Sequence, residues 1–237
     1  MKKLILVTKK IKKFNHKITV EGDKSLSIRF ALLASQASGK STAYNLLRSD
    51  DVINTLNCLK KLGVKIKFKN NCCEIHGNGI NSFKYKRNLV LNLGNSGTLG
   101  RLLLALLIRS PYKIKLIGDQ SLSKRDFSRV ILPLRKFGAN FYPKNKKTLP
   151  IHIKGTNFLR PIEYFEKRAS AQVKSCIMLG ALNSPGITRI IAKKSRNHTE
   201  ILFKYLKIPI SVRKTKNFDF IKVNGKKNFT SFNYNIP

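Results

Sequence analysis

Basic and hydroxyl side chains gather where an apolar helix is predicted to begin. Residues 22–29 read Gly-Asp-Lys-Ser-Leu-Ser-Ile-Arg, which places Lys24, Ser25 and Arg29 in or near the first turns of that helix. A helix start presents unpaired N–H groups and a positive dipole end, so each cation there costs a few tenths to about 1 kcal/mol. A bound phosphate or carboxylate reverses that cost. The segment therefore predicts an anion site, with helix caps and solvated charges as the alternative.

Two later segments repeat this combination of a polar turn and an apolar helix. The polar residues are Asn95, Gly97, Thr98 and Arg101 in the second segment and Ser170, Gln172 and Lys174 in the third. Basic loops at 121–126 and 194–199 precede the helices that follow. If the three segments converge, their helix starts form one cleft with many anion donors.

Each segment opens one unit of an internal repeat. We expect three βαβαββ-type units, at 20–77, 90–155 and 165–225, forming an α/β (α+β) domain with inner helices and outer sheets. Val52, Leu56 and Leu59, for example, share one face of a predicted helix. The expected helices are 24–35, 52–62, 99–108, 128–137, 170–182 and 200–206. The expected strands are 42–46, 64–69, 72–76, 112–117, 139–143, 150–153, 187–191, 208–213 and 218–223.

The composition allows a packed core and carries an extreme charge. The chain has 237 residues, is 42% apolar and has a net charge of +37. Nucleic-acid binding, a small-anion enzyme and the Lys- and Asn-rich composition of AT-rich genomes are three explanations for that charge. The four cysteines lack metal or disulfide spacing, so we expect buried or idle thiols. No apolar stretch reaches the length of a membrane span, and a cytoplasmic location is expected.

Five motifs together resemble the N-terminal half of the 3-phosphoshikimate 1-carboxyvinyltransferase (EPSP synthase) family. They are Gly-Asp-Lys-Ser-Leu-Ser-Ile-Arg, Leu-Gly-Asn-Ser-Gly-Thr-Leu-Gly-Arg, Ser-Leu-Ser-Lys-Arg, Ser-Ala-Gln-Val-Lys-Ser and Ser-Arg-Asn-His-Thr-Glu, in that order. The resemblance covers essentially the whole chain. It implies one domain of the "inside-out" barrel fold of the enolpyruvyl transferases.

The resemblance also implies a reaction and a set of site residues. Enolpyruvyl transfer from phosphoenolpyruvate to the 5-hydroxyl of shikimate 3-phosphate needs no metal or organic cofactor. By motif position, the shikimate 3-phosphate site comprises Lys24, Ser25, Arg29, Ser170, Ala171, Gln172 and Ser195. The phosphoenolpyruvate site comprises Lys24, Asn95, Gly97, Arg125 and Gln172. Lys24, which contacts both substrates, is the expected catalytic residue.

The chain departs from the family pattern in three residues and in length. Ile28 stands where a polar residue is usual, Asp126 where Pro is usual and Asn197 where Asp is usual. We expect Asp126 to compete for the guanidinium of Arg125. The family has a second domain that supplies the carboxylates for proton transfer, and the 11 acidic residues here include no matching pair.

These departures define the expected organisation and its alternatives. Residues 20–228 form the shikimate 3-phosphate-binding domain, 1–19 a lead-in strand of the missing second domain, and 229–237 the crossover to it. We expect either a truncated enzyme or one half of a split enzyme, with little activity alone. In the split form, a separate chain carries the second domain. The alternatives are an inactive remnant and a basic nucleic-acid-binding domain. The last rests on charge alone, because no RNA-binding signature with aromatic platforms is present; nucleic acid is therefore not an expected partner.

Overall fold

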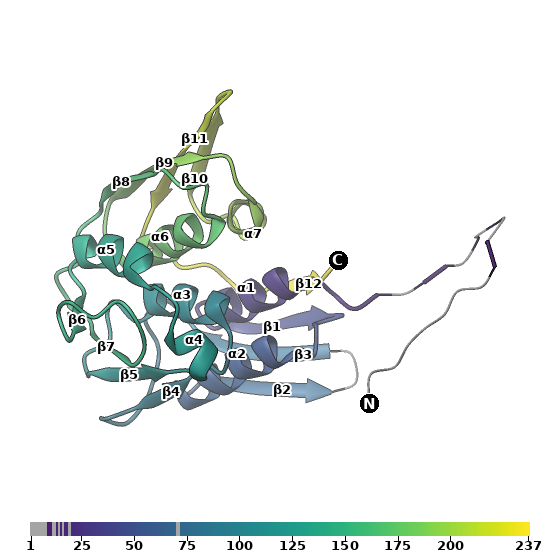
Figure 1. The fold of residues 1–237 in the computed structure, drawn as a ribbon, viewed down its shortest axis with the longest axis horizontal. Coiled ribbons are helices and arrows are strands. Elements are labelled where there is room, and N and C mark those ends of the chain that lie inside the picture. The colour runs from purple at the N-terminus through teal and green to yellow at the C-terminus, as the bar shows by residue number, and fades with distance from the viewer. Residues whose placement is uncertain (1–8, 11–12, 14, 16, 19, 70–71) are drawn as a thin grey trace.

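A computed structural model shows three sheets on the outside of the chain with helices between them (Figure 1). It describes residues 9–10, 13, 15, 17–18, 20–69 and 72–237. The predicted lead-in strand at 1–19 lies for the most part outside these described residues. The expected α/β fold with three repeated units is confirmed.

Three helices form the interior, one from each repeated unit. They are α1 (Lys24–Ala34), α3 (Gly97–Leu106) and α6 (Ala171–Asn183). Most of their residues are buried on every side, as expected for helices surrounded by other elements. Because α3 packs against both α1 and α6, the three helix starts are positioned relative to one another by the core.

The outer helices are amphipathic or short. α2 (Asp50–Lys61), α5 (Ser128–Phe137) and α7 (His198–Tyr205) each follow the first long strand of their unit. A further short helix, α4 (Gln120–Ser123), lies in the predicted loop at 121–126. Its N-cap Asp119 accepts a hydrogen bond from the Leu122 amide, which explains why a polar loop forms a helical turn here.

The three four-stranded sheets share one order. Each has an edge strand parallel to the next strand, followed by two antiparallel strands. The second sheet contains β4 (Val90–Asn92), β5 (Ile114–Ile117), β7 (Ile151–Lys154) and β6 (Asn140–Tyr142). The third contains β8 (Glu163–Glu166), β9 (Ile187–Lys193), β11 (Phe218–Asn224) and β10 (Ile210–Lys214).

The first sheet differs in where its parallel edge strand comes from. It contains β1 (Ser38–Tyr44), β3 (Cys72–Asn78) and β2 (Lys65–Lys69), and its fourth strand is β12 (Asn233–Asn235). The unit at 20–77 has no leading strand of its own in the described residues, so β12 occupies the place that β4 and β8 occupy elsewhere. This segment belongs to the predicted crossover at 229–237.

Most predicted element boundaries are correct within a few residues, with one larger difference. The helix at 128–137 is observed with the predicted bounds, whereas β1 begins at Ser38 instead of 42. Gly39, within these added residues, has a φ of 107°, a left-handed backbone conformation that glycine adopts readily. Within the described residues, no helix is long and apolar enough to cross a membrane.

Candidate active site

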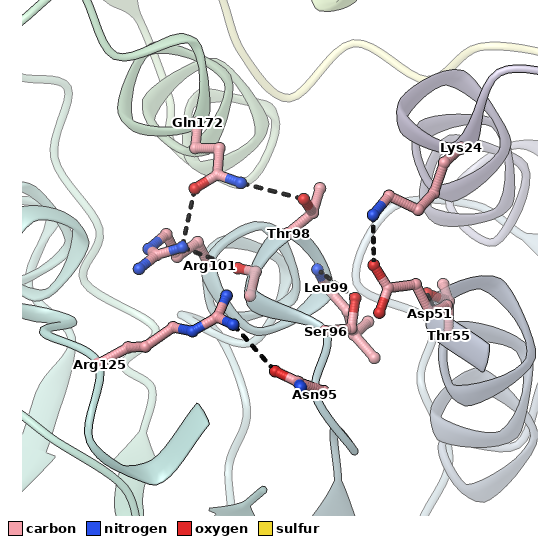
Figure 2. A network of polar contacts seen from close by, with 11 residues as sticks. Lys24, Asp51, Thr55, Asn95, Ser96, Thr98, Leu99, Arg101, Arg125 and Gln172 are labelled. Atoms are coloured by element: carbon pink, nitrogen blue, oxygen red, sulfur yellow. Dashed lines mark hydrogen bonds and ion pairs between the residues drawn. The ribbon is translucent and has the colours of Figure 1, made fainter. Parts of the chain in front are cut away.

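The start of α3 carries the second predicted motif and lies beside the Arg125 loop (Figure 2). Ser96 caps the helix by accepting a hydrogen bond from the Leu99 amide at 3.3 Å. Asn95, directly before the cap, accepts a hydrogen bond from Nη2 of Arg125 at 3.0 Å. The loop that follows α4 is therefore held against the start of α3.

A polar bridge joins the second and third units. Nη1 of Arg101 donates to Oε1 of Gln172 at 2.8 Å, and Nε2 of Gln172 donates to Oγ1 of Thr98 at 3.0 Å. Arg101 is 8% exposed and also lies over the Phe127 ring. Burial, followed by the neighbouring Arg129 and Arg125, lowers the pKa of Arg101. Gln172 thus connects the starts of α3 and α6 with both of its amide atoms.

Gly97 lies beneath two guanidinium groups. A Cβ at this position would lie 2.9 Å from Nη1 of Arg101 and 3.2 Å from Nη1 of Arg125, so a side chain here would displace both. Among the described residues, neither guanidinium lies within ion-pair distance of a carboxylate. Two cations therefore converge on the positive end of a helix without an acidic partner, an arrangement that favours a bound anion.

Lys24 has a protein partner on the next helix. Asp23 caps α1 by accepting from the Leu26 amide at 2.7 Å, and Nζ of Lys24 lies 3.0 Å from Oδ2 of Asp51 on α2. The Lys24 side chain is 51% exposed, so this ion pair is weak and open to exchange. Figure 2 places Lys24 on the opposite side of the α3 start from Gln172 and Arg125.

Arg29 is buried and connects three helices. Its Nε donates to Oγ1 of Thr199 at 2.8 Å, its Nη2 to Oγ of Ser175 at 3.0 Å, and its Nη1 to the Ser25 carbonyl at 3.0 Å. Burial lowers the pKa of Arg29 to about 10, which leaves it charged at neutral pH. Its acceptors are neutral oxygens, and hydrogen-bonding capacity remains on the two terminal nitrogens.

The remaining predicted site residues lie at the starts of α6 and α7. Ser170 caps α6 through a 3.3 Å hydrogen bond from the Val173 amide, and Ala171 is the first residue of that helix. Ser195 lies between β9 and α7, and its buried Oγ lacks a hydrogen-bond partner within the described structure. An unsatisfied buried hydroxyl is unfavourable unless a ligand or water completes it.

The expectation that Lys174 belongs to the anion site at the start of the third interior helix, α6, is wrong. Its side chain is fully buried, with Nζ 2.6 Å from Oε1 of Glu200 and 3.9 Å from Oδ2 of Asp219. The helical turn from Ser170 to Lys174 directs this side chain inward between α6, α7 and β11. Burial of a lysine requires such carboxylate partners.

Of the three departures from the family pattern, Ile28 and Asp126 have local structural roles. Ile28 is fully buried in α1, and Asn197 precedes α7 without a side-chain cap bond. Asp126 accepts hydrogen bonds from the amide and hydroxyl of Ser128, at 2.6 and 2.8 Å. Burial acts to raise the pKa of Asp126, but the two hydrogen bonds from Ser128, together with the positive charges of Lys147 and Arg129, lower it overall. The expected competition for Arg125 is not observed, since no ion pair joins these two described side chains.

Three groups of predicted residues are thus connected by hydrogen bonds, one of them being Gln172 with Arg101 and Thr98. Arg125 bonds to Asn95, and Ser25 bonds to Arg29. Sequence reasoning missed Asp51 as the partner of Lys24, and Ser175 and Thr199 as the partners of Arg29. Ser175 and Thr199 lie within two of the quoted motifs, so their position was a signal, but their pairing with Arg29 required the fold.

Comparisons with known proteins agree on one family. A family model described as EPSP synthase (3-phosphoshikimate 1-carboxyvinyltransferase) matches residues 8–237. A 3-phosphoshikimate 1-carboxyvinyltransferase of Streptococcus mutans is 38% identical over 222 residues, covering 93% of this chain and 51% of the relative. That of Lactococcus lactis is 41% identical over 186 residues, covering 78% and 43%.

A solved structure gives the same result. The EPSP synthase of Acinetobacter baumannii superposes with a TM-score of 0.85 at 35% identity, over 94% of this chain and 49% of that one. The chain therefore spans about half the length of the curated relatives it matches.

Proposed function

Since the chain belongs to the EPSP synthase family, we propose that it is the shikimate 3-phosphate-binding half of an enolpyruvyl transferase. In this proposal a second domain, on the same or a separate chain, completes the enzyme. The complete enzyme transfers the enolpyruvyl group of phosphoenolpyruvate to the 5-hydroxyl of shikimate 3-phosphate, in aromatic amino acid biosynthesis.

The convergence of Arg101 and Arg125 over Gly97 is the observation that carries the proposal. Both guanidiniums lack a carboxylate partner among the described side chains and lie at a helix start. Planar guanidiniums bind phosphate and carboxylate oxygens in pairs. Phosphoenolpyruvate carries both groups, so this position suits it.

The roles of the other residues follow from their positions and motifs. Asn95, Gly97, Arg125, Gln172 and Lys24 hold phosphoenolpyruvate, and Arg101, which converges with Arg125 over Gly97, joins them. The shikimate 3-phosphate site comprises Lys24, Ser25, Arg29, Ser170, Ala171, Gln172 and Ser195. The exposed Lys24 exchanges Asp51 for substrate oxygens and stabilises charge during transfer.

The proton transfers require groups beyond this half. The addition step needs an acid at the methylene carbon and a base at the 5-hydroxyl. Asp23, Asp51, Asp126 and Glu200, four described carboxylates near the candidate residues, already accept hydrogen bonds or pair with a lysine. The second domain therefore supplies the acid and base in this proposal.

Measurements of binding and of turnover test the two parts of the proposal: substrate binding by this chain, and catalysis that requires the second domain. We expect calorimetry to detect weak binding of shikimate 3-phosphate to the purified chain. A phosphate-release assay with both substrates should show little turnover until a separately produced second domain is added. Arg125→Gln should abolish that turnover. The matched control Lys124→Gln, an adjacent exposed lysine, removes the same charge and should retain it.

The outcomes have distinct meanings. Full turnover by the chain alone would contradict the role of the second domain. Binding without turnover in the reconstituted mixture would support the site but not catalysis. Absence of both binding and turnover would favour an inactive remnant.

A further inference from the structure

A connected series of hollows crosses the outer side of the second unit. Two hollows, of about 300 and 590 Å³, share Asn88 and Lys113, and the second shares Tyr142 with a third of about 420 Å³. The third shares Arg135 with a fourth of about 610 Å³. The lining residues come from β4, β5, β7, β6, α5 and the loops between them, and we call this region the second-sheet surface; Figure 1 labels these elements.

Lysines and arginines line both halves of this surface. Arg87, Lys113, Lys115 and Lys154 line the first two hollows. Arg135, Lys144, Lys146 and Lys147 line the other two. No Asp or Glu is among the described residues that line the four hollows. A linear surface of one charge attracts a linear polyanion.

The first and third sheets differ from the second because each of them carries an ion pair between neighbouring strands. Lys40 pairs with Glu74 across the first sheet, and Arg189 pairs with Glu163 across the third. No such ion pair crosses the strands of the second sheet, all of which are described. Burial, then Lys113 and Lys115, lowers the pKa of His152 at the centre of this face, consistent with a local excess of positive charge.

Two exposed tyrosines lie among these cations. Tyr142 is 37% exposed with Lys113 over its ring at 5.1 Å, and Tyr112 is 38% exposed with Arg87 over its ring at 5.1 Å. Strand register places Tyr142, His152 and Lys115 in one row across β6, β7 and β5. Aromatic rings beside backbone-binding cations form the stacking platform on which single-stranded nucleic acid binds.

We propose that the second-sheet surface binds single-stranded nucleic acid, with lysines and arginines on the phosphates and Tyr112 and Tyr142 stacked on bases. No residue of the candidate active site is among those lining the four hollows. The proposal therefore rests on residues other than those of the proposed function. Sequence analysis gave nucleic-acid binding only as an alternative that rests on charge, because the two tyrosines come from a loop and a strand that only the fold brings to one face.

Fluorescence anisotropy with a labelled oligouridylate tests the proposal on the full chain. We expect log K to fall linearly with log salt concentration. Substitution of Lys113, Lys115 and Lys154 by Gln should reduce the magnitude of that slope by about 2, since each phosphate contact on a single strand contributes about 0.7. The matched control changes three exposed lysines on the other two sheets, Lys65, Lys67 and Lys193, to Gln, and should change the slope far less.

Two further measurements test whether the tyrosines stack on bases and which class of polyanion binds. Tyr142→Ser should weaken oligouridylate binding several-fold, whereas Tyr44→Ser, at a tyrosine 46% exposed on the first sheet, should not. Shikimate 3-phosphate should not compete. Equal binding of inorganic polyphosphate with no effect of Tyr142→Ser would overturn the proposal, as would binding to phosphatidylserine vesicles but not to oligouridylate. An equal reduction of the salt slope in the triple variant of the second-sheet surface and in its matched control would also overturn the proposal.

Discussion

Two cations that the sequence places at helix starts, Arg29 and Lys174, are buried with different partners. Arg29 donates to two hydroxyls and a carbonyl, so its positive charge is not neutralised by those contacts. Lys174 pairs with two carboxylates and contributes no net positive charge to its surroundings. Only the first arrangement leaves a cation available to an incoming anion.

The Lys174 ion pair makes a prediction about stability. Lys174→Met should lower the free energy of unfolding by about 3–5 kcal/mol, because it leaves two buried carboxylates unpaired. Urea denaturation measures the change. Lys40→Met is the matched control, since Lys40 and Glu74 form an exposed pair expected to contribute about 1 kcal/mol or less.

A compensating variant distinguishes charge from packing. Adding Glu200→Gln and Asp219→Asn to Lys174→Met should restore a large part of the lost stability, because no uncompensated charge remains buried. If the triple variant is as unstable as the single one, the loss arises from packing, and the electrostatic explanation is wrong.

At the level of elements, β12 connects distant parts of the chain. Phe232, directly before the strand, packs edge-on against Phe30 of α1 with ring centroids 5.1 Å apart. The Asp23 amide, next to the α1 start, donates to the Pro237 carbonyl at 2.8 Å. The segment after residue 229 thus supports the helix that carries Lys24 and Arg29.

Phe232→Ala should therefore destabilise the chain by about 2 kcal/mol, since it removes a partly buried ring that packs against the interior helix α1. The control Phe158→Ala truncates a ring that is 90% exposed and should change stability little. Thermal unfolding of both variants checks the difference. Equal unfolding temperatures for the two variants would contradict a supporting role for the segment.

The local sequence pattern predicted secondary-structure elements more accurately than it predicted the interaction partners of individual side chains. The amphipathic spacing of 128–137 predicted α5 with its observed bounds. The partner of Arg29, Thr199, is 170 residues away, and no local pattern encodes such a contact. Lys174 was misassigned because a position in the first helical turn does not reveal which way a side chain points.

At the level of the whole molecule, the net charge of +37 opposes compaction. Screening weakens repulsion between exposed charges over a Debye length of about 10 Å at 0.1 M salt. We expect the urea midpoint of unfolding to rise as sodium chloride is added at low ionic strength. A midpoint that does not change would show that the excess charges are too far apart to interact.

The strand order of the first sheet also bears on how the chain is made. Sheets two and three are assembled from strands that leave the ribosome in one continuous stretch each. The first sheet must wait for β12, near residue 233, although its other strands are the earliest to be synthesised. The unit made first is therefore the last to be completed, and until then the parallel edge of β1 stays open to pairing with other nascent chains.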